Sequence, residues 1–186
     1  RRALESELPL EAAAAAQALR DLEGEQALPA LRARLRQGRS DLTQQTVLDL
    51  LHLESSSLRL TPVAKLAALC GCDLFQSSPL RDLLTIVAAS EQCEIDGTSL
   101  FEPGERADNL FLILRGGATL THADGRKTEH TSPSLIGMEA LHRPRYESEA
   151  FMAEGEVLVI PAQVILAAAQ AYPRLATRLF QHRVAA

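Results

Sequence analysis

The chain has 186 residues, of which 46% are hydrophobic, so it can bury the core of one domain with a small satellite. Its formal net charge of −5 does not favour non-specific binding to nucleic acid or to an anionic membrane. The cysteines, Cys70, Cys72 and Cys93, are odd in number and form no C-x-x-C pair, which argues against a disulfide framework and a structural zinc site.

The N-terminal third of the chain is expected to be wholly helical. Residues 10–22 are rich in alanine, the strongest helix former, and Gly24 ends this run. A second helix over residues 26–37 is expected to end at Gly38, because glycine is common just after a helix. Two helices joined by so short a break predict an antiparallel helical hairpin.

A third helix is expected over residues 41–53. Asp41 can cap its first turn, and Gln44 can complete a capping box. Residues 27–31, Ala-Leu-Pro-Ala-Leu, resemble the start of a helix in HEAT repeats. An ordinary helical bundle is the alternative interpretation.

Further helices are expected after a serine-rich linker at residues 54–57. Thr61 suits an N-cap and Pro62 the first helical turn, where its missing N–H costs nothing. Proline marks the beginning of later helices in the same way. The expected helices cover residues 61–71, 79–89 and 161–171, and residues from 174 to the end of the chain.

Between these helices, short strand-like runs separated by glycine predict a small antiparallel β-roll. The continuous apolar run at residues 110–114 is typical of a strand buried on both faces. The expected strands cover residues 92–95, 99–101, 110–114, 118–122, 126–130, 148–153 and 157–160.

A hairpin is predicted at residues 124–125, because Asp-Gly adopts the positive φ angles of a tight two-residue turn. That register places His130 opposite Thr119 and His122 opposite Lys127. The two histidines would then not be cross-strand partners, so a metal pair is not expected.

The order and spacing of these pieces resemble the cyclic nucleotide-binding domain of bacterial catabolite-activator-type regulators and of the regulatory subunits of cyclic-AMP-dependent protein kinase. The resemblance covers the chain from about Ala64 to its C-terminus. Its matching pieces are Gly97 before Leu100-Phe101, Pro103-Gly104-Glu105, Ala107-Asp108, the apolar run at 110–114, Gly116, Ile136-Gly137, Ala140-Leu141 and Val159-Ile160-Pro161.

The resemblance implies an α+β protein with two domains. Residues 1–57 would form helical, HEAT-like hairpins. Residues 58–186 would form an antiparallel β-roll, also called a double-stranded β-helix or jelly roll, with flanking helices. In the family, the last of these helices moves when ligand binds.

In the family, one cassette binds the ligand: a glycine, a glutamate for the ribose, a short helix, and an arginine for the phosphate. Gly137 matches the glycine, but Met138 stands at the glutamate and Glu147 at the arginine. A one-residue slip places Glu139 at the carboxylate or Ser148 at the arginine, and neither restores an arginine. The candidate pocket comprises Gly137, Met138, Glu139, Ala140, Leu141, Arg143, Arg145, Glu147 and Ser148.

The charge at Glu147 disfavours ordinary cyclic AMP or cyclic GMP as a cofactor. An anion about 4 Å from this carboxylate would meet roughly 4 kcal/mol of repulsion at an effective dielectric near 20. The lost arginine–phosphate hydrogen bonds would add roughly 1.5–3 kcal/mol. Two alternatives stay open: Arg143 and Arg145 could serve as substitute phosphate ligands, or the pocket could take a larger nucleotide or an uncharged molecule.

No catalytic motif such as G-x-S-x-G or H-E-x-x-H occurs, so we expect neither an enzyme nor a bound metal. The chain begins at Arg1 without a signal peptide, and residues 157–171 are too short to span a bilayer. We expect a cytoplasmic regulatory module excised from a larger protein, whose partners are a nucleotide-type small ligand and other domains of its host, not nucleic acid.

Two alternatives to a ligand sensor remain. One is a ligand-free interaction or structural module, whose pocket would be filled by its own side chains, such as Met138, Arg145 or Tyr146. The other is a truncated transcription factor. By resemblance, helical repeats followed by such a roll also occur as soluble tails of bacterial membrane transporters.

Overall fold

The structure, a computed structural model, describes residues 2–6, 8–35, 43, 46–47, 50, 60–76 and 78–185. The chain divides into two compact units, Arg1–Ala67 and Ala68–Ala186. The predicted linker at 54–57 and the predicted domain boundary after residue 57 lie outside the described residues, so both stay predictions.

The first unit is helical. Its alanine-rich helix α1 buries one face, including Ala12, Ala16 and Leu19, and ends at Gly24, whose φ is +56°. Of the predicted helix over 41–53, the structure describes residues 43, 46, 47 and 50, all helical. The unit contains η1 (Arg2–Glu5), α1 (Pro9–Glu23), η2 (Gly24–Ala27), α2 (Leu28–Leu35) and the start of α4 (Pro62–Cys70).

The core of this first unit consists of aliphatic side chains. Its buried members among the described residues are Leu4, Ala16, Leu19, Ala27, Leu31, Val47 and Leu50. Packing of this kind suits a HEAT-like hairpin and an ordinary helical bundle equally well, so the HEAT-like assignment stays a prediction.

The helices predicted for the second domain are present, close to their expected bounds. At α4, the hydroxyl of Thr61 accepts a hydrogen bond from the N–H of Ala64 over 3.2 Å, which confirms the predicted N-cap. Proline occupies the position before or at the start of the helices that follow η3 (Asp73–Phe75). These are α5 (Leu80–Ala89), α6 (Ala162–Ala171) and α7 (Pro173–Ala185).

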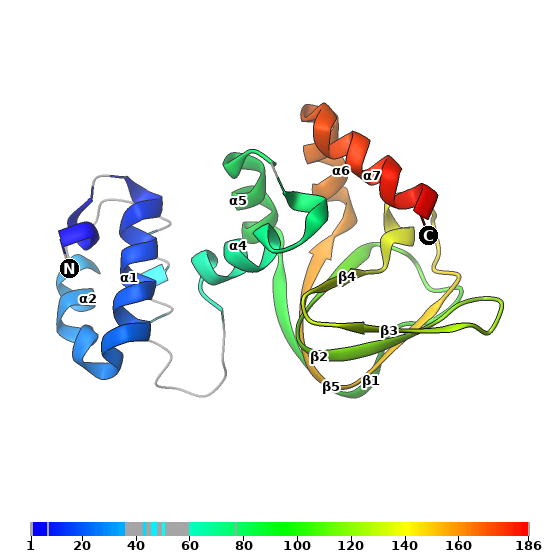
Figure 1. Ribbon diagram of the computed structural model, residues 1–186, viewed down its shortest axis with the longest axis horizontal. Coiled ribbons are helices and arrows are strands. Elements are labelled where there is room, and N and C mark those ends of the chain that lie inside the picture. Colours follow the sequence, from blue (N-terminus) through cyan, green and yellow to red (C-terminus); the bar gives the residue numbers. More distant parts are fainter. Residues whose placement is uncertain are drawn as a thin grey trace. The chain divides into compact units, whose positions relative to one another are not determined.

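An antiparallel sheet forms the second unit's β-roll, with helices α5, α6 and α7 on one side (Figure 1). Strands pair in the order β1-β5-β2-β3, and β4 pairs with β2. The predicted apolar run is central: Leu110, Leu112 and Ile113 are fully buried in β2. The strands are β1 (Glu91–Phe101), β2 (Asn109–Thr121), β3 (Lys127–Thr131), β4 (Ser134–Ile136) and β5 (Glu149–Pro161).

Three strands are longer than predicted, because glycines that were expected to end strands lie inside them. Gly116 of β2 pairs with Gly155 of β5, next to shifts in the strand register. A Cβ atom on Gly116 would lie 2.4 Å from the carbonyl oxygen of Glu154, and one on Gly155 would lie 2.3 Å from that of Arg115. These glycines therefore permit a close backbone approach within a continuous strand.

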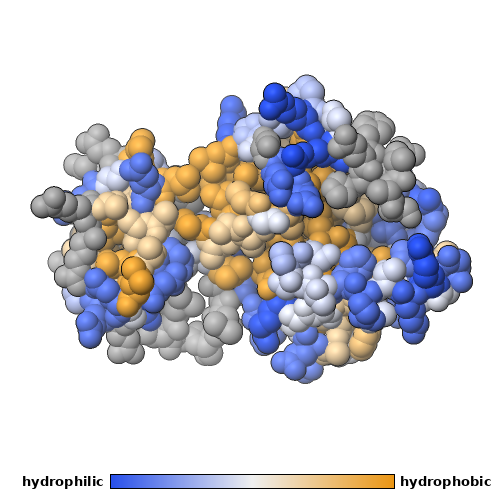
Figure 2. Space-filling model, viewed as in Figure 1, coloured by the Kyte–Doolittle hydropathy of each residue, from blue (hydrophilic) through white to orange (hydrophobic). Residues whose placement is uncertain are grey.

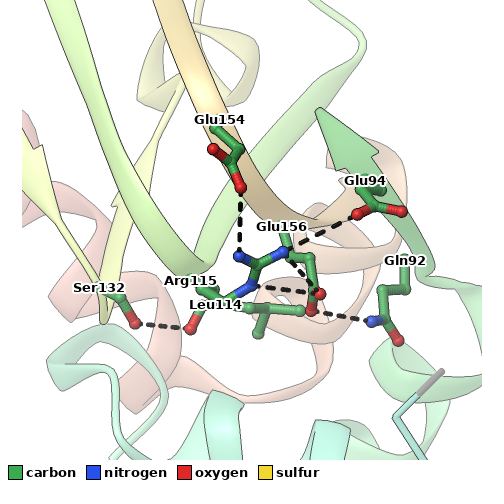
Figure 3. A network of polar contacts seen from close by, with 7 residues as sticks. All are labelled: Gln92, Glu94, Leu114, Arg115, Ser132, Glu154 and Glu156. Carbon is green, nitrogen blue, oxygen red and sulfur yellow. Dashed lines mark hydrogen bonds and ion pairs between the residues drawn. The ribbon is translucent and has the colours of Figure 1, made fainter. Parts of the chain in front are cut away.

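Arg115 lies at this irregular point and connects three strands (Figure 3). Its guanidinium group lies 3.3 Å from the carboxylate of Glu156, 3.8 Å from Glu154 and 3.9 Å from Glu94. The amide of Gln92 also donates to Glu156, over 3.2 Å. Glu156 is nearly buried, so this network neutralises a carboxylate that water reaches poorly.

The surface of the roll is mostly polar on the face shown in Figure 2, whereas apolar residues gather over α5. Leu80 of α5 leaves 42% of its surface exposed, while Leu83, Ile86 and Val87 of the same helix are buried. None of the helices in the described part of the chain is both long enough and apolar enough to cross a membrane.

Candidate functional site

The predicted cassette begins with a glycine that the backbone requires. Strand β4 pairs with β2 through Ile136 and Phe111, and Gly137 then turns the chain with a φ of +78°. A Cβ atom here would lie 3.2 Å from the carbonyl oxygen of Asn109 and 3.4 Å from the ring of Phe111. The positive φ and the close neighbours both favour glycine.

A short helical turn follows, as the cassette predicts. This turn is η4 (Met138–Leu141), in which the N–H of Ala140 donates to the carbonyl of Gly137 over 3.1 Å. The N–H groups of His142 and Arg143 both donate to the carbonyl of Glu139, over 2.9 and 2.7 Å. Ala140 is buried, so the turn presents its other side chains away from the core.

Beside η4 lies a cavity of about 880 Å³, a size suited to a small-molecule site. Its walls come from the β2–β3 hairpin, β4, η4, the segment after η4 and Leu179 of α7. Aliphatic side chains form much of the lining: Leu120, Leu135, Ile136, Met138, Leu141 and Leu179. The carboxyl and guanidinium side chains in the lining are those of Asp124, Arg126, Glu139, Arg143 and Glu147.

Tyr146 anchors the segment after η4 to the core of the roll. Its ring stacks on Phe101, with centroids 4.1 Å apart, and its hydroxyl donates to the carbonyl of Asn109 over 2.6 Å. Burial is the main cause that raises the pKa of Tyr146 to about 12. The ring is 4% exposed and does not line the cavity.

The β2–β3 hairpin has a different register from the predicted one. Its turn contains three residues, 123–125, because the N–H of His122 donates to the carbonyl of Arg126 over 2.8 Å. His130 consequently pairs with Ala118, and Thr121, not His122, pairs with Lys127. The prediction that His130 faces Thr119 is therefore wrong by one residue.

This register brings the two histidines together on the cavity wall. Thr128 lies between them: its hydroxyl is 3.1 Å from Nε2 of His122 and 3.3 Å from Nε2 of His130. Nδ1 of His130 is 3.2 Å from the hydroxyl of Ser134. Burial, and then the neighbouring His122, lower the pKa of His130, while Glu129 has the opposite effect. The four side chains form one hydrogen-bonded chain.

Comparison with known proteins bears on the second unit. No protein-family model and no curated protein matches the chain. The sensor domain of the transcriptional regulator DNR from Pseudomonas aeruginosa is similar over 63% of this chain and 88% of its own length, at 17% identity and a TM-score of 0.58. A protein from Geobacter metallireducens GS-15 described as cyclic nucleotide-binding is 25% identical over 61% of this chain and 88% of its own, with a TM-score of 0.53.

A third similar structure is the regulatory subunit of a cAMP-independent protein kinase A from Trypanosoma brucei. The similarity covers 64% of this chain and 47% of the kinase subunit, at 15% identity and a TM-score of 0.55. The β-roll unit has the fold of cyclic nucleotide-binding domains. The α+β class and the antiparallel roll with flanking helices that the sequence predicted are thus confirmed.

Within this cyclic nucleotide-binding fold, most of the predicted cassette residues meet at the cavity. Ala140 lies behind the wall in the core, and Arg145 lies outside, where its guanidinium donates to the carbonyl of Gly104. The predicted residues that line the cavity are Gly137, Met138, Glu139, Leu141, Arg143, Glu147 and Ser148.

Four polar members of the cassette interact in pairs. Arg143 forms an ion pair with Glu147, four residues later, and both side chains are about half exposed. The hydroxyl of the buried Ser148 donates to the carboxylate of Glu139. Arg143 is therefore the counter-ion of Glu147, the residue that the sequence alignment predicts at the position of the phosphate-binding arginine.

The cavity residues of the hairpin were not predicted from the sequence. His122, Thr128 and His130 alternate along their strands and share the face that lines the cavity. This alternation is visible in the sequence, and a three-residue turn at 123–125 would have brought the two histidines to one face. Leu179 has no comparable signal, because only the tertiary fold brings α7 to the cavity.

Proposed function

We propose that this chain is the regulatory or sensor module of a larger protein, and that its cavity binds a small ligand other than cyclic AMP or cyclic GMP. The observation that supports the proposal is the cavity beside η4, whose lining includes the Arg143–Glu147 ion pair. In the proposed alignment with the cassette, Glu147 falls at the position of the phosphate-binding arginine. A site of drug-like volume with mixed apolar and polar walls suits a specific small molecule.

The negative charge of Glu147 disfavours a cyclic phosphate in the cavity, even if Arg143 were free to bind that phosphate. The pair is half exposed, so separating it would cost only about 0–1 kcal/mol. A released Arg143 could then face a phosphate, but the carboxylate of Glu147 would remain in the same cavity without its counter-ion. Water screens this repulsion because Glu147 is half exposed, but the phosphate would still meet a like charge where it needs a cation.

A route from the ligand to the rest of the module runs through α7. Leu179 lines the cavity, and Arg178 of the same helix donates a hydrogen bond to the carbonyl of Asp73 in η3. A ligand in contact with Leu179 would favour one packing of α7 over another. Other domains of the host protein, in the cytoplasm, would respond to the change in the packing of α7. The module itself would have no catalytic role.

The structural neighbours support a sensor or regulatory role for this chain at the level of the fold. One is named as a sensor domain, and another as the regulatory subunit of a cAMP-independent kinase. Sensor and regulatory roles in such proteins agree with the proposed role, and the second name shows that this fold also occurs in a protein described as independent of cyclic AMP.

A ligand-free interaction module is the second candidate, and the Arg143–Glu147 pair is the observation that favours it, because the pair satisfies its own charges. That alternative predicts a pocket filled by side chains such as Met138, Arg145 or Tyr146. Met138 lines the cavity without closing it, whereas Arg145 and Tyr146 lie outside, where they contact Gly104, Asn109 and Phe101. The open cavity supports the sensor.

Titration calorimetry tests the proposal with cyclic AMP, cyclic GMP and cyclic di-GMP. The protein is expected to give no binding heat with cyclic AMP or cyclic GMP, whereas binding heat with cyclic di-GMP would identify a larger nucleotide as the ligand. The double variant M138E/E147R restores both cassette side chains and is expected to gain cyclic AMP binding, whereas R145A changes an arginine outside the cavity and should gain none. Binding of cyclic AMP to the unaltered protein would overturn the proposed exclusion.

A further inference from the structure

The cavity's charges identify the kind of ligand that it would accept. Three carboxylates, from Asp124, Glu139 and Glu147, line it against two guanidinium groups, from Arg126 and Arg143. The Arg143–Glu147 pair cancels one charge of each sign. Asp124 and Arg126 belong to the exposed hairpin turn, at the cavity's edge, and Asp124 there accepts the backbone N–H of Arg126 over 2.9 Å.

Glu139 is the carboxylate that remains. Its described hydrogen-bond partner is the hydroxyl of Ser148, which is a neutral donor. Within the part of the chain that the structure describes, no cation lies within ion-pair distance of Glu139. An ionised carboxylate has about four acceptor positions, so one hydroxyl leaves several for a ligand.

The hairpin wall adds polar side chains that already form hydrogen bonds with one another. The hydroxyl of Thr128 and the ring nitrogens of His122 and His130 are engaged with one another and with Ser134. Burial keeps the pKa of His130 below its ordinary value, so this ring is neutral at neutral pH. Six aliphatic side chains, from β2, β4, η4 and α7, form most of the rest of the lining.

We propose that the cavity binds a small organic amine, whose ammonium group is held by the carboxylate of Glu139 and whose apolar ring lies against the aliphatic wall. This inference rests on the proposed function, because it requires that the cavity bind a ligand at all. An amine supplies the donors and the positive charge that Glu139 lacks, and a ring-sized apolar body matches the leucine, isoleucine and methionine side chains around it.

Three compounds with the same indole ring separate charge from shape. Tryptamine carries an ammonium group, tryptophol a neutral hydroxyl and indole-3-propionate a carboxylate. Calorimetric titration of each into the full chain is expected to show tryptamine binding at least about tenfold more tightly than tryptophol, the gain expected from one charge-assisted hydrogen bond. Indole-3-propionate is expected to give no binding.

Two matched variants test the role of Glu139. E139Q keeps the size of the side chain and an acceptor for Ser148, and should reduce the preference for tryptamine over tryptophol about tenfold. E129Q removes a carboxylate from the face of the β2–β3 hairpin that points away from the cavity. There Glu129 accepts a hydrogen bond from the hydroxyl of Thr119 over 2.8 Å, and the substitution should leave the preference unchanged. Thermal unfolding of both variants shows whether the fold is intact.

The outcomes distinguish this inference from the proposed function. If none of the three compounds binds, the amine inference is wrong, whereas the proposed function, which names no ligand class, is unaffected. If tryptophol or indole-3-propionate binds as tightly as tryptamine, the cavity is a ligand site but the amine inference is wrong. An unchanged preference in a folded E139Q variant would contradict the assignment of Glu139.

Discussion

At the residue scale, two glycines inside strands show how the backbone determines which residue is allowed. Gly116 and Gly155 face each other across β2 and β5, with backbone atoms where a side chain would begin. Gly125 in the hairpin turn has a similar positive φ of +81°, but no atom lies within 4 Å of the position of its missing Cβ. Gly116 and Gly125 both have a positive φ, but only Gly116 has close neighbours. Comparing alanine substitutions at these two positions therefore separates the cost of a steric clash from the cost of a positive φ.

The variant G116A is expected to lower the free energy of unfolding by more than about 3 kcal/mol, because strain and a clash with the carbonyl of Glu154 add together. The control G125A bears only the strain of its positive φ and should cost about 1 kcal/mol. Urea denaturation of both variants measures the difference. Equal losses would mean that the sheet can relax around the new methyl group at Gly116.

Tyr146 also makes a prediction at the scale of a single residue. Because the pKa is raised from 10.0 to about 12 in the folded protein, the unfolded chain releases the phenol proton first. The stability that Tyr146 contributes is therefore fully present below pH 10 and decreases as the pH rises towards 12. The Y146F variant should remove this alkaline dependence, at a cost of about 1 kcal/mol at neutral pH for the lost hydrogen bond to Asn109.

Ultraviolet absorbance of the phenolate against pH measures the same group directly. The chain has two tyrosines, and one late titration step, near pH 12, should disappear in Y146F. If both tyrosines titrated near pH 10 in the folded protein, the burial of Tyr146 against Phe101 would be contradicted.

At the scale of the elements, the positions of most strands could be predicted from the sequence, but the register in which the strands pair could not. Alternation and turn signals were sufficient to predict most strands, including the buried run in β2. The register of the β2–β3 hairpin depends on whether its turn has two or three residues, and Asp124-Gly125 is compatible with both lengths. The difference of one residue in the length of the turn determines whether His130 lies opposite Thr119 or Ala118.

The Arg115 network gives a prediction for the junction of β1, β5 and β2. In R115M the nearly buried carboxylate of Glu156 loses its cation and retains the amide of Gln92, so we expect a loss of about 1–3 kcal/mol in the free energy of unfolding. In the control E94Q, an exposed carboxylate 3.9 Å from Arg115 is removed, and the loss should stay below about 0.5 kcal/mol.

Chemical denaturation of the two variants, at low and moderate salt, is the measurement. A loss in E94Q as large as that in R115M would contradict the assignment of Glu156 as the main partner, since screening should weaken an exposed pair far more than a buried one.

At the scale of the whole molecule, the fold of the second unit could be predicted from the sequence, whereas the cavity could be predicted only in part. Ordered pieces such as the run at 110–114 and Ile136-Gly137 identified the roll. The ion pair of Arg143 with Glu147 depends on side-chain geometry along an irregular segment, and Leu179 reaches the cavity from a helix distant in sequence. No local pattern records such contacts.

The central proposal is that Glu147, whose counter-ion is Arg143, lies where a cyclic phosphate would otherwise bind. Diffraction from crystals of the protein soaked in cyclic AMP tests it most directly. The account predicts an unchanged Arg143–Glu147 pair and no nucleotide density in the cavity beside η4. Clear density for cyclic AMP in that cavity, with its phosphate next to residues 143–148, would contradict it.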